Sequence, residues 1–158
     1  MPRRKSVNYK RIITPDPVYG SELVSKFVNV VMECGKKSIA RKIVYDALEM
    51  ASGSSDKDKV LNLFTKAFEQ LIPHVEVRAR RVGGSVYQIP AKVRQDRAEA
   101  LALRWLVNAA ATRNDETMGK RLAKELLEAS EGRGNAVKKK LDVHKMAEAN
   151  RAFSHFAW

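Results

Sequence analysis

The chain is poor in the residues that build disulfide frameworks and metal sites, with one cysteine and three histidines among 158 residues. The single cysteine, Cys34, excludes a disulfide within the chain. It stands in the apolar run VVMECG, which predicts a small buried residue rather than a reactive thiol. His144 and Glu148 are four residues apart, but no second histidine completes a zinc-binding HExxH pattern, so a surface pair is the simpler interpretation.

Long apolar runs and nucleotide-binding signatures are also missing. No segment approaches the ~20 apolar residues of a membrane span, and the first residues, MPRRKSVNYKR, lack the apolar core of a signal peptide. The glycine pair at 83–84 is not followed by the Gly-Lys-Ser/Thr of a phosphate-binding loop. We therefore expect an intracellular protein that is not an enzyme, needs no cofactor and binds neither a membrane nor a small-molecule substrate.

Acidic residues are outnumbered, since 30 lysines and arginines face 18 aspartates and glutamates and leave a net charge of +12. A compact protein with this excess repels itself unless an anion relieves it, and nucleic acid is a better candidate than an anionic membrane surface. The apolar content of 44% argues against disorder as the main state. The length suits one domain with a real core.

The chain divides into a basic leader and a helical domain. Residues 1–15 hold five cations and no acid, and we expect them to be extended until they bind a partner. Residues 16–158 show apolar residues at helical spacing in six segments, joined by short connections that favour antiparallel neighbours around one core. The predicted fold class is mainly α, a six-helix body with a protruding two-stranded β-hairpin inserted between the third and fourth helices.

The apolar stripes predict the buried face of each helix. Asp58 follows Ser55 by three residues, and Glu99 follows Asp96 by three, which is typical of capping boxes at helix N-termini. The stripes are Leu23, Phe27, Val30, Val31 and Cys34, up to Gly35; Ile39, Ile43, Ala47 and Met50, up to Gly53; Val60, Phe64, Ala67 and Leu71, up to Pro73; Ala98, Leu101, Trp105 and Ala109; Met118, Leu122, Leu126 and Ala129, up to Gly132 and Gly134; and, from about Asn135, Met146, Ala149, Phe153 and Phe156.

The stretch 75–94, VEVRARRVGGSVYQIPAKVR, predicts the hairpin. Gly83 and Gly84 can adopt positive φ and suit a two-residue turn. The resulting register pairs Val82 with Ser85, Arg80 with Tyr87 and Arg78 with Ile89, the last two pairs on one face. Eight residues per strand at ~3.3 Å each give an arm of roughly 25 Å. The ribbon is too charged to lie wholly inside a core, so we expect it to reach outward to a negative partner.

Further basic clusters lie outside the leader and the hairpin. Lys36 and Lys37 precede Arg41 and Lys42 at the start of the second helix, where side-chain charge and unpaired backbone N–H groups together predict an anion site. The other clustered cations are Arg113, Lys120, Arg121, Arg133, Lys138, Lys139 and Lys140. These patterns leave two partners open. A basic β-arm on a helical body also occurs in DNA-bending proteins that enter the minor groove, whereas scattered cationic patches and an extended leader suit a folded RNA.

Three motifs resemble one family along nearly the whole chain. GKKSIARKIVYDAL (35–48), RRVGGSVYQIP (80–90) and VHKMAEANRAFSHF (143–156) are similar to the bacterial-type small-subunit ribosomal protein seven family, and the likeness is collinear from about Arg3 to Trp158. The resemblance implies six helices with a β-hairpin between the third and fourth. It also implies a structural constituent of the small ribosomal subunit, a primary 16S-type rRNA-binding protein that nucleates head assembly in a cytoplasmic or organelle ribosome.

The resemblance further implies which residues bind. The hairpin tip is expected near the exit-site tRNA at the subunit interface, and small-subunit proteins nine and eleven are expected neighbours. The tip residues are Val82, Gly83, Gly84, Ser85 and Tyr87, and the expected rRNA contacts are Arg3, Arg4, Lys10, Lys36, Lys37, Arg41, Arg78, Arg80, Arg81, Arg94, Lys138 and Lys139. The chain departs from the family at Leu141, where an acid is usual, and at Gln95, where a proline is frequent. It ends in Phe156-Ala157-Trp158 and so lacks the family's penultimate arginine.

Overall fold

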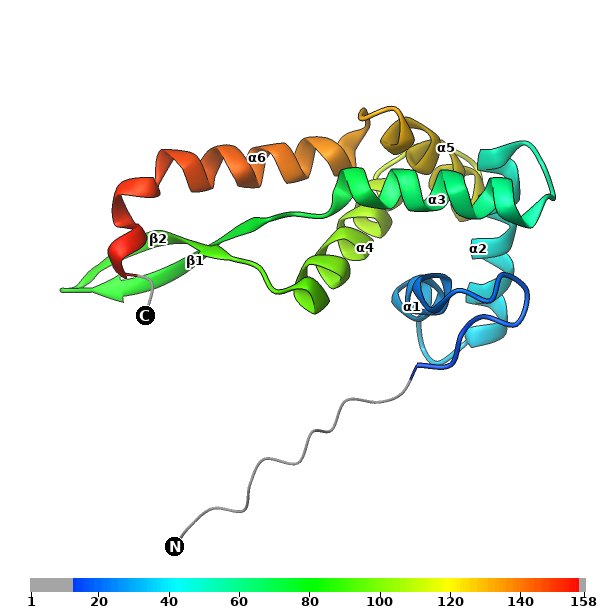
Figure 1. The fold of residues 1–158 in the computed structure, drawn as a ribbon, viewed down its shortest axis with the longest axis horizontal. Helices are drawn as coiled ribbons and strands as arrows, with labels where there is room; N and C mark the ends of the chain where they lie inside the picture. Colours follow the sequence, from blue (N-terminus) through cyan, green and yellow to red (C-terminus); the bar gives the residue numbers. More distant parts are fainter. Residues whose placement is uncertain (1–12, 157–158) are drawn as a thin grey trace, which may run out of the picture.

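A computed structural model describes residues 13–156 of the chain, without the side chains of Val82 and Phe156. The leader cations predicted to bind rRNA, Arg3, Arg4 and Lys10, lie outside the described residues. The predicted fold class is confirmed, since six α-helices carry a two-stranded antiparallel sheet between the third and the fourth (Figure 1). In chain order the elements are α1 (Glu22–Val31), α2 (Lys37–Ser52), α3 (Lys57–Leu71), β1 (Val75–Val82), β2 (Ser85–Lys92), α4 (Gln95–Ala111), α5 (Met118–Ser130), α6 (Asn135–Ala149) and the 3₁₀ helix η1 (Arg151–Phe156).

Helix α5 is the centre of the helical body, because it contacts α2, α3, α4 and α6. Of its predicted stripe, Leu122, Leu126 and Ala129 are fully buried, while Met118 is half-buried. Phe27 of α1 stacks on Phe64 of α3, with ring centroids 5.4 Å apart. One connected cluster of buried apolar side chains therefore joins all six α-helices, and removal of this apolar surface from water is the main favourable term for the fold.

The hairpin has the predicted register and turn. Gly83 and Gly84 have φ values of 56° and 91°, and the strands pair from Val82–Ser85 back to Val75–Lys92. The arm is not free-standing, however, because α6 contacts both strands and η1 contacts β2, and α6 runs alongside the hairpin in Figure 1. A lone two-stranded ribbon is marginal in water, so this cover supports it. We call the hairpin, η1 and the second half of α6 the wing.

The prediction of a buried Cys34 is wrong. Helix α1 ends at Val31 and Met32 is extended, so the helical stripe does not continue to residue 34. Cys34 is exposed and has a φ of 50° in the turn that leads into α2. The residues that α1 buries are Val24, Phe27 and Val28.

Helix α2 ends at Gly53 as predicted, but its buried face is rotated by about one residue. Ile39, predicted to be buried, is 55% exposed, and Met50 is exposed as well. The residues that α2 buries are Ala40, Val44, Ala47, Leu48 and Ala51. The rotation leaves an isoleucine in solvent at the first turn of the helix.

The helix ends differ from the predicted capping boxes. Asp56, not Ser55, caps α3, and its side chain accepts a hydrogen bond from the Asp58 N–H at 3.3 Å. Arg94 is the N-cap residue of α4 and supplies no side-chain cap, while Asp96 lies within the first turn. An acid in the first turn still complements the positive end of the helix dipole.

The sixth helix is shorter than predicted. Helix α6 ends at Ala149, and the chain continues as the 3₁₀ helix η1, so Phe153 does not extend the predicted stripe. Met146 is exposed. The residues that α6 buries are Ala136, Val137, Val143 and Ala147.

Candidate nucleic-acid interface

The predicted rRNA-binding cations that the structure describes form separate groups rather than one patch. One group begins α2, one lies on β1, and one lies in the first turns of α6. Helix α2 and the hairpin tip lie toward opposite ends of the long axis of the molecule (Figure 1). The groups are Lys36, Lys37 and Arg41; Arg78, Arg80 and Arg81; and Lys138 and Lys139, with Arg94 just before α4. An anion that contacts all of them must be large.

The start of α2 combines two cations with a helix N-terminus that no side chain caps, although the Lys37 N–H is already donated to the Gly35 carbonyl at 2.8 Å. Lys36 is the N-cap residue of α2, and no side chain caps the helix. Lys36 and Lys37 are exposed. Within residues 13–156, neither of them forms an ion pair with an acid. The first N–H groups of a helix lack partners inside the helix and carry partial positive charge. This end of α2 therefore suits a phosphate.

Arg41 is placed differently from the two lysines. It is half-buried, and its Nε is buried without a hydrogen-bond partner among the described residues. The Tyr45 hydroxyl donates to the two oxygens of Asp16 at 2.8 and 2.7 Å. Burial, and to a smaller extent this hydrogen bond, raises the pKa of Tyr45 to about 12, while the positive charge of Arg41 lowers it. Arg41 thus supplies positive charge from below the surface.

The three arginines of β1 are not equivalent. Arg78 donates from Nε to Glu76 Oε1 at 2.7 Å, and Arg97 of α4 donates to Glu76 Oε2 at 3.3 Å. Burial raises the pKa of the Glu76 carboxyl, but the hydrogen bonds and charges of the two arginines outweigh it and leave the pKa below its usual value. Arg80 and Arg81 are exposed and have no acid partner among the described residues. They are the better candidates for phosphate contact.

The face of the hairpin that carries Tyr87 turns toward the C-terminal segment. Tyr87 lies opposite Arg80 as predicted, but it is half-buried and its ring centroid lies 5.0 Å from that of Phe153 in η1. Ile89, two residues along on the same face, is buried. Packing against η1 limits how much of the Tyr87 ring can meet a nucleobase. The tip residues that are exposed are Gly83, Gly84 and Ser85.

The run of three lysines in α6 also divides. Lys138 and Lys139 are exposed. Lys140 instead donates from Nζ to the Gln70 carbonyl of α3 at 2.6 Å, and burial lowers the pKa of its ammonium group. Lys140 therefore ties α6 to α3, while the two lysines before it remain available to an anion.

The histidine pattern does not form a metal site. His144 Nε2 accepts the His74 backbone N–H at 3.3 Å. Burial, and then the charges of Lys140 and His74, lower the pKa of His144 and favour this neutral acceptor. Across residues 13–156 no group of three or more histidine, cysteine, aspartate or glutamate residues is arranged to hold a metal ion. None of the helices in that range is long and apolar enough to cross a membrane.

A buried acid was missed from the sequence. Glu125 of α5 is 0% exposed. Its Oε2 accepts from Arg113 Nε at 2.7 Å, and its Oε1 accepts the Ala136 N–H at the start of α6 at 2.8 Å. The signal was present, because Glu125 lies within the apolar stripe of α5, between Leu122 and Leu126.

Several cations of the predicted clusters are already occupied within the protein. Lys120 pairs with Glu116 at 2.6 Å, and Arg133 pairs with Glu131. Arg121 donates to the Asp115 carbonyl at 2.6 Å. Arg113 contacts Glu128 as well as Glu125. Ion pairs of this kind reduce the charge that these residues offer to an external anion.

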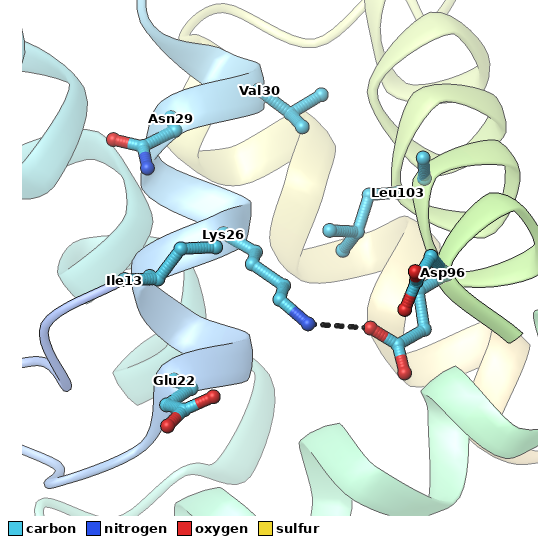
Figure 2. A pocket seen from close by; sticks show the side chains of 9 residues that line it. Ile13, Glu22, Lys26, Asn29, Val30, Asp96 and Leu103 are labelled. Atoms are coloured by element: carbon cyan, nitrogen blue, oxygen red, sulfur yellow. Dashed lines mark hydrogen bonds and ion pairs between the residues drawn. The ribbon is translucent and has the colours of Figure 1, made fainter. Parts of the chain in front are cut away.

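A groove between α1 and α4 shows where an anion is not favoured (Figure 2). Its volume is about 490 Å³. Glu22, Asp96 and Glu99 line it against a single lysine, Lys26, which donates to Glu99 Oε2 at 2.6 Å. Among residues 13–156, the lining therefore holds three carboxylates and one ammonium group.

Exposed cations without acid partners, carried at several points of a helical body and its hairpin, define a protein that binds a large nucleic acid. The chain belongs to the family described as Ribosomal protein S7p/S5e, whose family model matches residues 2–151. Small ribosomal subunit protein uS7 of Acidithiobacillus ferrooxidans is 55% identical, and that of Psychromonas ingrahamii 56% identical, over 158 residues that cover both chains completely. The chain is thus an RNA-binding structural component of the small ribosomal subunit that acts in translation, in a family that is not one of enzymes.

Proposed function

We propose that this protein is a primary binder of small-subunit rRNA, that it nucleates assembly of the subunit head, and that its hairpin tip lies near the exit-site tRNA. Small-subunit proteins nine and eleven are the proposed neighbours. The bacterial relatives support a bacterial cytoplasmic ribosome as its location. The protein contributes charge and shape to a folded RNA and performs no chemistry on it.

One observation carries this proposal. Lys36, Lys37, Arg80, Arg81 and the first two lysines of the α6 run are exposed without acid partners in the described part of the chain. Because these cations lie in separate groups, a single straight duplex is a poorer fit than a folded RNA, whose phosphates approach from several directions. Each phosphate that a cation neutralises releases counterions, which makes the affinity fall with salt.

The proposal is tested by competition binding at matched salt. We expect an in vitro transcript of small-subunit rRNA to bind more tightly than duplex DNA of similar length, and the double variant Lys36→Gln/Lys37→Gln to bind the transcript more weakly. Each lost phosphate contact makes the slope of log affinity against log salt shallower by roughly 0.7–0.9.

The matched control is the double variant Lys120→Gln/Lys124→Gln. These lysines are exposed as well, but they pair with Glu116 and Asp115, so the slope is expected to change less. Equal affinity for duplex DNA and for the rRNA transcript would contradict the ribosomal proposal and favour a DNA-bending protein. An equal change of slope in the two double variants would remove the α2 lysines from the proposed contacts.

The hairpin tip is tested in reconstituted small subunits. Arg80→Glu/Arg81→Glu is expected to reduce retention of exit-site tRNA while the helical circular dichroism signal stays unchanged, because both side chains are exposed. Arg78 is left intact, since it holds Glu76. The control Lys66→Glu changes an exposed cation on α3. Unchanged tRNA retention in subunits that contain the double variant would contradict the placement of the tip.

A further inference from the structure

A second groove lies beside the two lysines that begin α2. It is formed by the end of α1, the start of α2, the end of α4 and the start of α5, and its volume is about 540 Å³. Its apolar wall consists of Val31, Ile39, Ile43, Val107, Ala111 and Met118. We call it the α2 groove. Its size lies within the range of pockets that enclose small organic ligands.

Part of the apolar wall is exposed to solvent at the first turn of α2. Ile39 lies in the first turn of α2 and is 55% exposed. Lys36, Ile39 and Ile43 share one face of the helix because their spacing follows its turns, and all three line the groove. A cation and an apolar surface therefore meet along one edge.

The polar residues at the rim indicate which kind of ligand would fit the groove. Lys36 lines the groove and adjoins the open N-terminus of α2. Asn108 and Glu33, which also line it, offer amide and carboxylate groups. An unstacked nucleotide has matching parts: a phosphate for the cation, an apolar face for the aliphatic wall, and a hydrogen-bonding edge for the rim.

We propose that the α2 groove receives one unstacked nucleobase of the rRNA, whose phosphate lies on the side chains of Lys36 and Lys37 and on the N–H groups of the first turn of α2 that follow Lys37. This inference rests on the proposed rRNA binding. Charge complementarity and direct continuity with the α2 cations select this occupant. The groove between α1 and α4 has a similar volume, but its described lining holds three carboxylates and one lysine, whereas the α2 groove holds one carboxylate, Glu33, and Lys36 (Figure 2).

The test distinguishes the contribution of the nucleobase to binding from that of its phosphate. Ile39→Asn is expected to weaken binding of the rRNA transcript about tenfold, near the lower end of the range for loss of a base stacked on an aromatic side chain because this wall is aliphatic, with the salt slope unchanged because no phosphate contact is removed. The control Leu127→Asn replaces another exposed apolar residue, on α5 outside the groove, and is expected to leave the affinity unchanged. Circular dichroism checks that both variants keep their helical content.

Cys34 provides an independent readout in the unmodified protein. It is the only cysteine, is exposed and lines the α2 groove. We expect saturating rRNA transcript to slow its alkylation by iodoacetamide, and saturating polyphosphate, which has no bases, to leave the rate near that of the free protein. Equal protection of Cys34 by the two polyanions, or a shallower salt slope in Ile39→Asn, would overturn the proposal that the groove receives a nucleobase. The α2 lysines would then bind the RNA through charge alone. Unchanged transcript affinity in Ile39→Asn would also overturn it, whereas no transcript binding by the wild type would contradict the proposed function itself.

Discussion

The helical body and the wing each bury one glutamate, and the two are held in different surroundings. Glu125 in the body pairs with Arg113, whose side chain is only 15% exposed. Glu76 in the wing pairs with Arg78 and Arg97, whose side chains are 57% and 46% exposed. Water screens a partner that it can reach, while a buried pair depends on both members. The body therefore uses its acid as a structural connection, and the wing uses its acid to orient arginines that still face solvent.

The apolar packing of the two regions differs in the same sense. The body has stacked Phe27 and Phe64 within a continuous cluster. The buried apolar residues described in the wing are Ile89 of the hairpin and Val143 and Ala147 of α6, and none of them is aromatic. Regions with few buried apolar contacts open locally at a lower free energy than the core. We expect the wing to adjust to its RNA while the body remains a rigid platform.

The largest expected effect on stability comes from changing Glu125, the buried acid of the helical body. Glu125→Gln keeps the shape of the side chain but removes its charge, so Arg113 keeps only Glu128 and the Ala136 N–H loses a charged acceptor. Breaking a buried pair on one side costs about 3–5 kcal/mol, and we expect a loss near the lower end because Glu128 remains. The free energy of unfolding in urea measures it.

The control for this change is Glu131→Gln, which removes an exposed acid from its pair with Arg133. Its effect is expected to stay within about 0.5 kcal/mol. If Glu125→Gln were no more destabilising than the control, the buried carboxylate would not connect α5 and α6 as described.

The fold was predictable from the sequence because its signals are local. Helical spacing of apolar residues located all six helices, and the Gly83-Gly84 pair set the register of the hairpin. The errors in the predicted helix ends arose where tertiary structure, rather than the local spacing of apolar residues, determines where a helix stops. The stripe that ended at Cys34 crossed the end of α1, and the stripe of α6 ran past Ala149 into a 3₁₀ helix. Nothing in the spacing of these residues reports where a helix must stop to let the chain turn.

The candidate interface was predictable only in part. Runs of lysine and arginine identified the groups at α2, β1 and α6, since exposed charge needs no fold to be recognised. Arg78 is paired with its near neighbour Glu76, but the engagement of Lys140 depends on a contact with a distant segment, the Gln70 carbonyl of α3. The α2 groove could not be predicted either, because it brings together the ends of four helices. Its one local sign, an exposed Ile39, was interpreted as part of the core.

The stability of the wing is expected to depend less on Glu76 than that of the body depends on Glu125, and the pH dependence of unfolding measures the contribution of Glu76. The pKa of Glu76 in the folded protein lies below its ordinary value of 4.5, since the arginine interactions outweigh burial. A carboxyl whose pKa is lower in the folded state contributes stability above its unfolded pKa, and that contribution is lost as pH falls through the folded pKa. The contribution of Glu76 is therefore complete near neutral pH and disappears well below pH 4.5.

The smallest expected effect is the difference between the wild type and Glu76→Gln along this titration. Above pH 5 we expect the variant to be less stable by about 1 kcal/mol, which is below the ~1.5–3 kcal/mol of a hydrogen bond to a charged group, because Arg78 and Arg97 can turn to water. As the pH falls below 4.5 through the lowered pKa of the folded state, the difference should shrink, since the wild-type carboxyl becomes protonated in both states. Urea midpoints at each pH measure it, and the subtraction removes the other acids with lowered pKa values, Asp115, Glu116 and Glu128. A difference that does not shrink as the pH falls below 4.5 would mean that Glu76 stabilises the wing by packing rather than by charge. A loss as large as that of Glu125→Gln would remove the distinction between the two regions.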